Sequence, residues 1–246
     1  MLTQLRTNMP VHYSAEQYDR YTENSVEVYD DAITRRLLQE QRLMRVQSPT
    51  VLDIGTGTAQ LLVRMAHDPL LANFRLIGTD FFDDMVAQAQ ETVRRNNLTH
   101  RVSIEHSDVH DLPNADNSVE FVISRSTIHH WANPVKAFQE IYRVLKPEGV
   151  AIIHEPRRDP NPEALAEFNR QRATVGVEPS RMDEKYIADE VRQFLKDAGL
   201  ANQSIVSAPQ SGPGSMGFEV RISKCHPLKV RVISWIAKFK CWRNSW

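Results

Sequence analysis

The segment VLDIGTGTA, over residues 51–59, constrains the fold of this chain more than any other stretch. An apolar run containing Asp53 is followed by Gly55 and Gly57, two glycines one residue apart. Glycine permits backbone conformations that a Cβ obstructs, and the apolar pattern over 60–67 predicts a helix directly after the turn. The free N–H groups at the start of that helix face the turn. The segment therefore predicts a buried strand, a tight turn and a helix, with a negatively charged or electron-rich ligand group close to the backbone.

Composition bounds the class of protein. The 246 residues fit one α/β domain with a modest extension, and 30 Lys and Arg against 31 Asp and Glu give a formal net charge of −1. This balance does not favour nucleic acid as a partner. Cys225 and Cys241 form no CxxC pair, so we expect no metal site. No apolar run is long enough for a membrane span and the N-terminus lacks a secretory pattern, so we expect a soluble, cytoplasmic protein.

Strand-like and helix-like segments alternate along the middle of the chain. The predicted strands lie at 51–54, 75–81, 101–108, 118–124 and 149–155, and the predicted helices at 60–67, 82–97 and 133–145. A turn signal, Lys-Pro-Glu-Gly, occupies 146–149. Further on we predict helices at 163–172 and 183–198, then two strands, 203–208 and 218–223, with no helix between them. The predicted fold is α/β: a doubly wound, Rossmann-like sheet of seven strands, mostly parallel with an antiparallel last strand, and helices on both faces.

Three acidic residues follow the pattern of this sheet. Asp53, Asp80 and Asp108 each lie at or just before the carboxyl end of a predicted parallel strand, the edge where ligands bind in open α/β sheets. Any one of them could instead cap the next helix. Asp80 is placed to accept hydrogen bonds from ribose hydroxyls, and Asp108 from an exocyclic amine of a purine. Asp53 can hold the turn or, through water, a ligand ammonium, and Phe81 can pack on an adenine ring.

Five motifs together resemble a known family. They are DIGTGTA at 53–59, GTDFFDDMVAQA at 78–89, HSDVHDLP at 106–113, FVISRSTIHHW at 121–131 and LKPEGVAIIHE at 145–155. Over about residues 48–223 the chain resembles the class I methyltransferases that depend on S-adenosylmethionine, in the small-molecule, quinone-biosynthesis-like branch (methyltransferase type 11). It departs from the family at Ala59, where many members carry a third glycine.

The resemblance implies S-adenosylmethionine as the cofactor and assigns residues to it. The methionine end would lie on the glycine turn, the ribose on Asp80 and the adenine amine on Asp108, with Ser124 and Arg125 lining the cofactor. The full set of cofactor-binding residues that we predict is Tyr21, Asp53, Gly55, Thr56, Gly57, Asp80, Phe81, Met85, Asp108, Val109, Ser124 and Arg125.

Other interpretations of the same motifs are less well supported. A nicotinamide fingerprint needs G-x-G-x-x-G, and residue 60 is Gln. Nucleobase amino methyltransferases resemble one another in an Asn/Asp-Pro-Pro-aromatic run after the fourth strand, where this chain has Ser-Arg-Ser-Thr over 124–127. No acid stands there for metal-assisted catechol transfer, and both cysteines lie in the tail, far from where arsenic chemistry would need them.

Three histidines are candidates for acid–base chemistry. His129 and His130, beside Trp131, follow the fourth strand and so lie near the expected sulfonium, where a neutral imidazole suits a general base. Either could instead cap the next helix or pack below the site. His154, next to Glu155 at the end of the fifth strand, is the third candidate, with the same structural alternative.

The remaining segments suggest the acceptor side and partners. We predict an N-terminal helical lid over 1–45, as in related enzymes, a core over 46–223 with a helical insert at about 160–182, and a basic, aromatic tail over 224–246. The tail would pack on the domain or seal a homodimer, or else contact a membrane peripherally. The predicted function is methyl transfer to a small molecule. The alternatives are a non-methylating reaction that uses the same cofactor electrostatically, and a catalytically silent cofactor-binding subunit.

Overall fold

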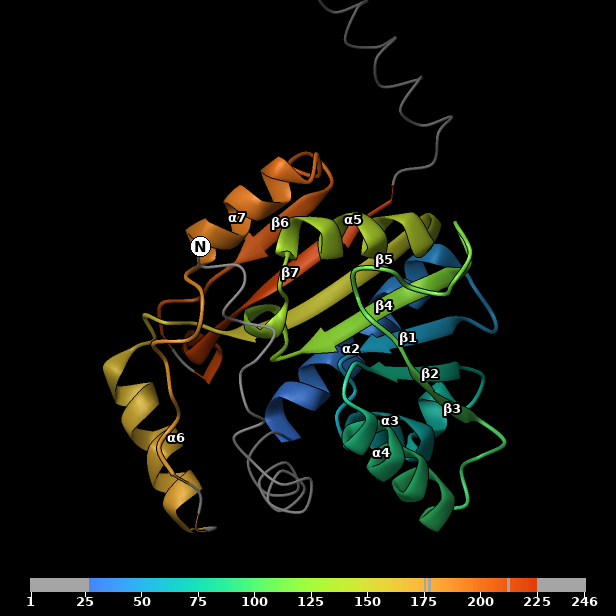
Figure 1. The fold of residues 1–246 in the computed structure, drawn as a ribbon, viewed down its shortest axis with the longest axis horizontal. Coiled ribbons are helices and arrows are strands. Elements are labelled where there is room, and N and C mark those ends of the chain that lie inside the picture. The colour runs from blue at the N-terminus through green and yellow to red at the C-terminus, as the bar shows by residue number, and fades with distance from the viewer. Residues whose placement is uncertain (1–26, 175, 177, 212, 225–246) are drawn as a thin grey trace, which may run out of the picture.

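A seven-stranded sheet forms the centre of the protein (Figure 1). The computed structural model describes residues 27–174, 176, 178–211 and 213–224. The strands are β1 Thr50–Ile54, β2 Arg75–Asp80, β3 Val102–His106, β4 Val119–Arg125, β5 Leu145–Pro156, β6 Ser204–Ser207 and β7 Gly217–Ser223. The helices are α2 Glu27–Met44, α3 Gln60–His67, α4 Asp83–Arg95, α5 Pro134–Val144, α6 Pro162–Thr174 and α7 Ala188–Asp197, with short 3₁₀ turns η2 Pro69–Leu71, η3 Ile128–His130 and η4 Pro213–Met216.

The strand order is β3-β2-β1-β4-β5-β7-β6, and β1 through β5 are paired in parallel. Leu52 of β1 faces Ile77 of β2 on one side and Val122 of β4 on the other. Only β7 runs the other way, between β5 and β6. The order reverses beside β1, so the carboxyl ends of β1, β2 and β4 meet where ligands bind in such sheets. The predicted fold class is confirmed.

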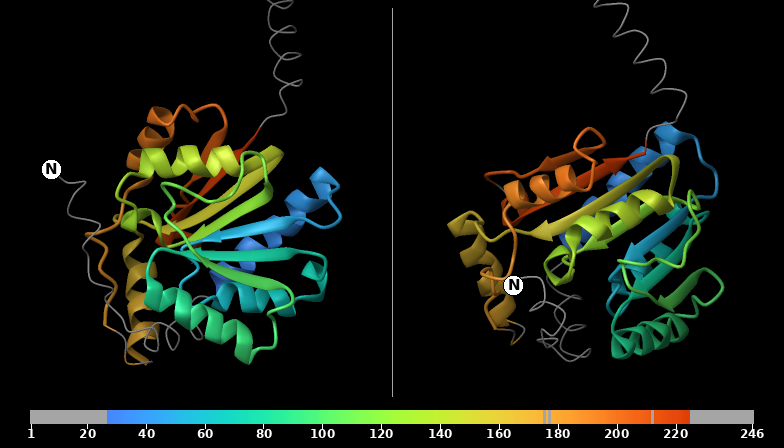
Figure 2. Two further views of the ribbon diagram at one scale, coloured as in Figure 1. Left: turned by 45° about the vertical axis from the view of Figure 1, so that its right-hand side comes forward. Right: turned by 45° about the horizontal axis from the view of Figure 1, so that its top comes forward.

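Helices cover both faces of the sheet (Figure 2). On one face, residues of α2, α3 and α4 pack with Phe121, Ile123 and Ile152 of the sheet in one buried apolar cluster. On the other face, α5 and α7 pack against Leu52 and Val122 in a second cluster. Strands buried on both faces read as continuous apolar runs, which is why 51–54 and 118–124 are recognisable in the sequence.

Two element boundaries differ from the sequence-based prediction by more than two residues. The Lys-Pro-Glu-Gly signal at 146–149 is not a turn between elements: β5 begins at Leu145, and the signal forms an irregularity in its pairing with β4, at which Glu148 has a φ of 72°. Helix α7 begins at Ala188, five residues later than predicted. It begins there because the Glu190 carboxylate accepts the N–H of Ile187 at 2.8 Å, which caps the helix.

Helix α2 is tied to the sheet by apolar and ionic contacts. Ile33 and Leu37 are fully buried in the core, and Glu40 accepts two hydrogen bonds from Arg221 of β7, at 2.7 and 2.9 Å. Arg36 donates to Glu219 of the same strand at 3.1 Å. This part of the predicted 1–45 lid therefore lies on the sheet; residues 1–26 and the predicted tail beyond 224 lie outside the described residues, and the lid stays a prediction.

A buried leucine on α2 gives a direct test of how this helix packs on the sheet. Leu37 is fully buried, whereas Leu43 on the same helix is 78% exposed. Replacing Leu37 with Ala leaves a cavity, so we expect a loss of about 2–4 kcal/mol in the free energy of unfolding. The matched Leu43→Ala control is expected to cost less than about 0.5 kcal/mol. Denaturant unfolding measures both, and equal losses would contradict this packing of α2.

Candidate cofactor and active site

The turn between β1 and α3 is shaped by residues in the left-handed backbone region. Gly55, Gly57 and Ala59 have φ angles of 69°, 56° and 65°. The N–H groups of Gly55 and Thr56 both donate to the Thr79 carbonyl of β2, at 2.8 and 2.9 Å. The turn is therefore held by the neighbouring strand, and the absent third glycine falls at Ala59, where glycine would relieve the strain of a positive φ.

Close packing makes Gly55 necessary as well. A Cβ on Gly55 would lie 2.5 Å from Cγ2 of Thr127, in the segment after β4. The turn is thus wedged between the ends of β2 and β4.

Asp53 stabilises this turn from beneath. Its side chain is 2% exposed and accepts a hydrogen bond from the Thr56 hydroxyl at 2.8 Å. Burial raises the pKa of Asp53 to about 7, against the opposing effects of the Thr56 hydrogen bond and of Arg125. The carboxyl group holds the turn directly, which is one of the two roles that its position in the sequence suggests.

Asp80 links the end of β2 to the turn. One oxygen accepts the N–H of Gly57 at 2.9 Å and the other accepts the N–H of Phe82 at 3.1 Å. Burial raises the pKa of Asp80, while these backbone hydrogen bonds lower it. The adjacent Phe81 ring is 49% exposed, unlike most large apolar side chains here, and Met85 on α4 is buried.

Asp108 is oriented by a histidine that sequence reasoning missed. The backbone N–H and the Nδ1 atom of His110 lie 2.9 and 2.5 Å from one Asp108 oxygen. The Nε2 atom of His110 accepts the N–H of Asn133, which fixes Nδ1 as the protonated nitrogen in the neutral ring. Asp108 is 44% exposed in its side chain, whereas Val109 is buried. Only the spacing of His110 within HSDVHDLP could have indicated this contact.

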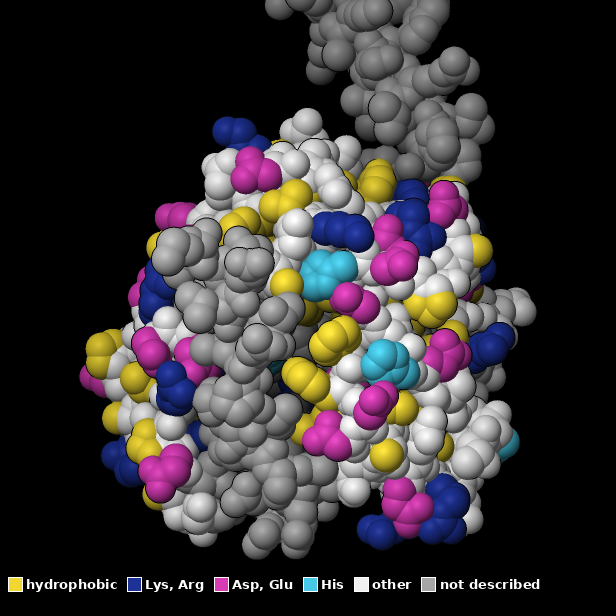
Figure 3. Space-filling model, in the orientation of Figure 1, with side chains coloured by type: hydrophobic (Ala, Val, Ile, Leu, Met, Phe, Trp, Pro, Cys, Tyr) yellow, Lys and Arg dark blue, Asp and Glu magenta, His cyan; other side chains and the backbone are white. Residues whose placement is uncertain are grey.

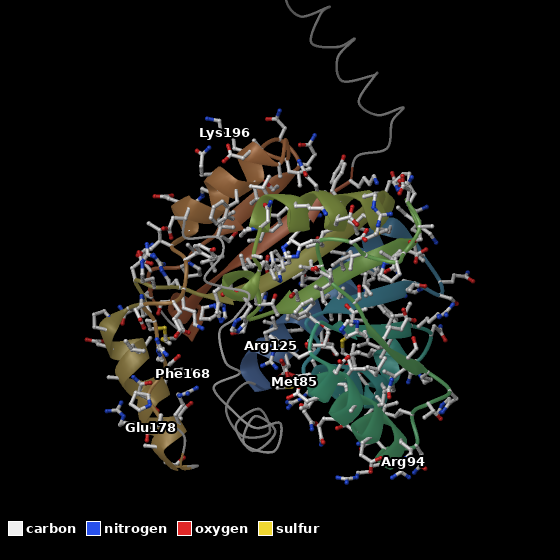
Figure 4. All side chains as sticks on the ribbon, in the orientation of Figure 1. Met85, Arg94, Arg125, Phe168, Glu178 and Lys196 are labelled. Carbon is white, nitrogen blue, oxygen red and sulfur yellow. The ribbon has the colours of Figure 1, made fainter. Side chains whose placement is uncertain are left out.

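The end of β4 carries the predicted Ser124 and Arg125. The buried Ser124 hydroxyl donates to the Ile54 carbonyl at 2.6 Å and lies 2.5 Å from the Thr127 hydroxyl. Arg125, labelled in Figure 4 near Met85, lies 3.3 Å from a carboxylate oxygen of Asp30 on α2. Asp30 is 1% exposed, and its burial raises its pKa. No local sequence pattern connects residues 30 and 125, so this pair was not predicted.

The three candidate histidines lie in different surroundings. His129 is 2% exposed and its Nδ1 contacts the Glu155 carboxylate, while its Nε2 lies 2.6 Å from Nζ of Lys185. The ring of His130 stands 3.9 Å from that of His129 and is exposed. His154 pairs with Glu219 of β7 at 3.0 Å. His154 and Glu155 therefore do not form a pair with each other, because successive residues of a strand point to opposite faces.

The structure brings most predicted residues to one edge of the sheet. Around the switch point lie Asp53, Gly55, Thr56, Gly57, Asp80, Phe81, Ser124 and Arg125, with His129 directly after β4. Tyr21 lies outside the described residues. Among the residues that the structure describes, no group of three or more His, Cys, Asp or Glu side chains is arranged to hold a metal ion. None of the described helices is long and apolar enough to cross a membrane.

A parallel sheet with one antiparallel strand near its edge and a glycine turn at the switch point defines the class I methyltransferase fold. A family model described as a methyltransferase domain matches residues 46–199. This chain belongs to that methyltransferase family. The predicted family is confirmed, and S-adenosylmethionine is the cofactor that the family implies.

Individual proteins show how far the likeness extends. A demethylmenaquinone methyltransferase from Listeria welshimeri is 34% identical over 112 residues, which are 45% of this chain and 47% of the relative. The chain thus spans about half the length of the demethylmenaquinone methyltransferases that it matches. A malonyl-[acyl-carrier protein] O-methyltransferase from Marinomonas is 28% identical over 88% of this chain and 72% of the relative. A structure from Methanococcus maripaludis, solved as a candidate S-adenosylmethionine-dependent methyltransferase, shares the fold with a TM-score of 0.65 at 22% identity, covering 86% of this chain and 92% of that one.

The raised pKa of Asp53 predicts a pH dependence of stability. Between pH 3.8 and about 7 the unfolded chain ionises this carboxyl group while the folded chain keeps its proton, so the free energy of unfolding falls as pH rises. In Asp53→Asn this loss is absent, and the amide oxygen can still accept from Thr56. We expect the wild type to lose roughly 2–3 kcal/mol relative to the variant between pH 5 and pH 8.

Chemical denaturation at the two pH values, without cofactor, measures the difference. Asp83→Asn is the matched control, because that side chain is 97% exposed on the next element. If the wild type and Asp53→Asn changed in parallel with pH, the buried carboxyl group would not titrate in this range.

Proposed function

We propose that the protein transfers a methyl group from S-adenosylmethionine to a small-molecule acceptor, of a quinone-like or specialised-metabolite type. The observation that carries this proposal is the meeting of the glycine turn with Asp80, Phe81 and Asp108 at one edge of the sheet. Each offers what a different part of the cofactor needs, and the family match points the same way.

The residues present fit the cofactor. The Asp80 carboxylate, although bonded to two backbone N–H groups, keeps lone pairs for the ribose hydroxyls, because each oxygen can accept more than one hydrogen bond. The exposed Phe81 ring suits the face of an adenine, and Asp108, held by His110, has a second oxygen for its exocyclic amine. The buried acids Asp53 and Asp30 provide negative potential toward a cationic ligand when they ionise, and such a ligand favours their ionised form.

The cofactor supplies a methyl group on a positively charged sulfur, ready for in-line displacement. The chain's own residues contribute orientation: the turn fixes the donor, and side chains after β4 and β5 face the acceptor. Of the three histidine candidates, His129 stands closest in sequence to the end of β4, and its partner Glu155 points to the face of the sheet opposite α2. His154 is engaged with Glu219 on the α2 side, which makes it the weaker candidate.

A small acceptor is supported by the surface and by the relatives. Acidic and basic side chains are interspersed on the coloured part of the face in Figure 3, with no continuous basic stripe there. The curated relatives are named for demethylmenaquinone and malonyl-[acyl-carrier protein]. The first name denotes a free small molecule and the second a small group attached to a carrier protein. We propose an acceptor group of this size for this chain.

The cofactor assignment predicts the effect of removing Asp80. Asp80→Ala loses up to two charge-assisted hydrogen bonds to the ribose, so we expect a 10- to 100-fold weaker affinity for S-adenosylmethionine, a loss of about 1.4–2.7 kcal/mol. Titration calorimetry measures it. Asp83→Ala, on the exposed start of α4, should bind as the wild type does. Unchanged affinity in Asp80→Ala would rule out the ribose contact.

Incubation with methyl-labelled S-adenosylmethionine distinguishes methyl transfer from the two alternative functions. With a dihydroxynaphthalene or an acyl-carrier malonyl thioester as acceptor, we expect label in the product. Product without label would favour a non-methylating reaction on this fold. Tight cofactor binding with no product from either acceptor would favour a silent cofactor-binding subunit.

A further inference from the structure

Three titratable side chains from separate segments form a connected row behind the end of β4. Glu155 comes from β5, His129 from η3 and Lys185 from the segment before α7. Glu155 contacts Nδ1 of His129, and Lys185 Nζ lies 2.6 Å from Nε2 of the same ring. The other Glu155 oxygen accepts the N–H of Ile128 at 3.0 Å, so the carboxylate is fixed in place. The row therefore has a defined direction, from buried carboxylate to amine.

Hydrogen-bond chemistry limits where the protons of the row can lie. An ionised carboxylate only accepts, so the Nδ1 atom of His129 carries a hydrogen toward Glu155. A neutral imidazole then accepts at Nε2 from Lys185, which can donate an N–H either as an ammonium or as a free amine. As a free amine that donates to Nε2, Lys185 keeps its own lone pair open toward a ligand. Once Lys185 has taken up a proton, that proton can move to Nε2 with no net change of charge in the buried row.

The two ends of the row differ in their access to solvent. The side chains of Glu155 and His129 are 0% and 2% exposed, whereas Lys185 is only partly buried. Lys185 is the only member of the row that a ligand could reach without a rearrangement of the core. The row starts just after β4, and the switch point of the sheet lies between β4 and β1. Because His129 follows β4 and Glu155 ends β5, the row lies at the carboxyl edge of the sheet, on the β5 side of this switch point.

Burial favours the free amine form of Lys185. Burial lowers the pKa of Lys185, and the cations Arg172 and Arg181 lower it further, while the acids Glu155 and Glu184 oppose this. Apolar side chains could join β5 to the segment before α7 without the free-energy cost of removing charged groups from water. A buried Glu–His–Lys row is therefore better explained by proton transfer than by stability.

We propose that Lys185 accepts the proton of a weakly acidic hydroxyl group on the methyl acceptor, with His129 and Glu155 as positioning residues for its amine. This inference rests on the proposed methyl transfer and narrows its acceptor to the class of phenols and enols. A hydroxyl of that class is mostly protonated at neutral pH, and its anion is a much better nucleophile.

The step balances in atoms and electrons. The acceptor O–H bond breaks and an N–H bond forms on the Lys185 amine, which leaves an oxyanion beside an ammonium. The oxyanion forms a bond to the donor methyl carbon as the carbon–sulfur bond breaks and its electron pair moves to sulfur, which becomes neutral. The proton on Lys185 is then shared with His129 and lost to water, which restores the free amine.

Competitive labelling of lysines with acetic anhydride across pH tests the row without any turnover. Only free amines react, so the pH midpoint of labelling for each lysine, read by peptide mass spectrometry, reports its ionisation independently of its access. We expect the midpoint of Lys185 to lie below those of the exposed Lys136 and Lys196. His129→Gln is expected to shift the Lys185 midpoint and leave that of Lys136 unchanged.

A Lys185 midpoint equal to those of Lys136 and Lys196 would overturn the proposal. The proposal would also fail if His129→Gln left the Lys185 midpoint unchanged while the variant kept its wild-type circular dichroism. Glu155→Gln is the second variant. It keeps His129 and should also shift the pH midpoint of Lys185 labelling.

Protection from labelling tests the acceptor class. In the presence of S-adenosylhomocysteine and without oxygen, 1,4-dihydroxynaphthalene is expected to slow the labelling of Lys185 at least fivefold. The same concentration of 1,4-dimethoxynaphthalene, which has no acidic proton, should give no protection. Equal protection by both compounds, or none by either, would overturn the hydroxyl acceptor.

A measurement of cofactor binding distinguishes a failure of the Lys185 proposal from a failure of the proposed methyl transfer. Calorimetry with S-adenosylmethionine on the wild type reports the cofactor site alone, and a protein that failed to bind it would lose the methyltransferase proposal whatever Lys185 did. Lys185→Arg keeps a positive charge but cannot accept a proton at neutral pH. With normal cofactor binding, it should reduce label transfer to 1,4-dihydroxynaphthalene by at least tenfold, and full transfer in this variant would overturn the role of Lys185.

Discussion

The parallel pairing of β1 with both β2 and β4 is the interaction on which the rest of the site depends. Its residues Val51 and Leu52 are fully buried, so the strand cannot shift without disrupting both apolar clusters. Both neighbours also hold the turn that follows β1. Thr79 of β2 accepts two of its N–H groups, and Thr127 after β4 leaves no room for a side chain on Gly55. The turn after β1 is therefore held by the same two strands that pair with β1 at the centre of the sheet.

Buried acids at this edge oppose folding and favour a cationic ligand. Asp30, Asp53 and Asp80 are each at least 92% buried, and burial raises the pKa of all three. Part of this cost is offset by Arg125. A ligand that carries an ammonium and a sulfonium group adds positive charge where the protein holds excess buried carboxyl groups. Binding of such a ligand to the folded state alone would then stabilise the protein by linkage.

The sequence predicted the parts of the fold that are local in the chain. Strands 51–54 and 118–124 are apolar throughout because both of their faces are buried, and the glycine turn is marked by residues that few other structures require. The boundary at 146–149 was wrong because a turn-type sequence can also form an irregularity within a strand, and only the pairing with β4 decides which. The predicted start of α7 was wrong because the cap of this helix depends on one side chain, Glu190, rather than on the apolar pattern.

The candidate site, like the fold, has parts that are local in the sequence and parts that depend on contacts between distant residues. The predicted cofactor residues that the structure describes lie at or within five residues of strand ends, so their sequence positions determine where they gather. The Glu155–His129–Lys185 row, by contrast, joins residues 26 and 56 positions apart, and no spacing rule connects them. It forms because η3, β5 and the segment before α7 meet around one buried imidazole. The predicted cofactor residues are thus positioned mainly by the central strands, and the row by contacts between side chains of β5 and of two segments outside the sheet. A family built in this way can keep one methyl donor while the acceptor varies.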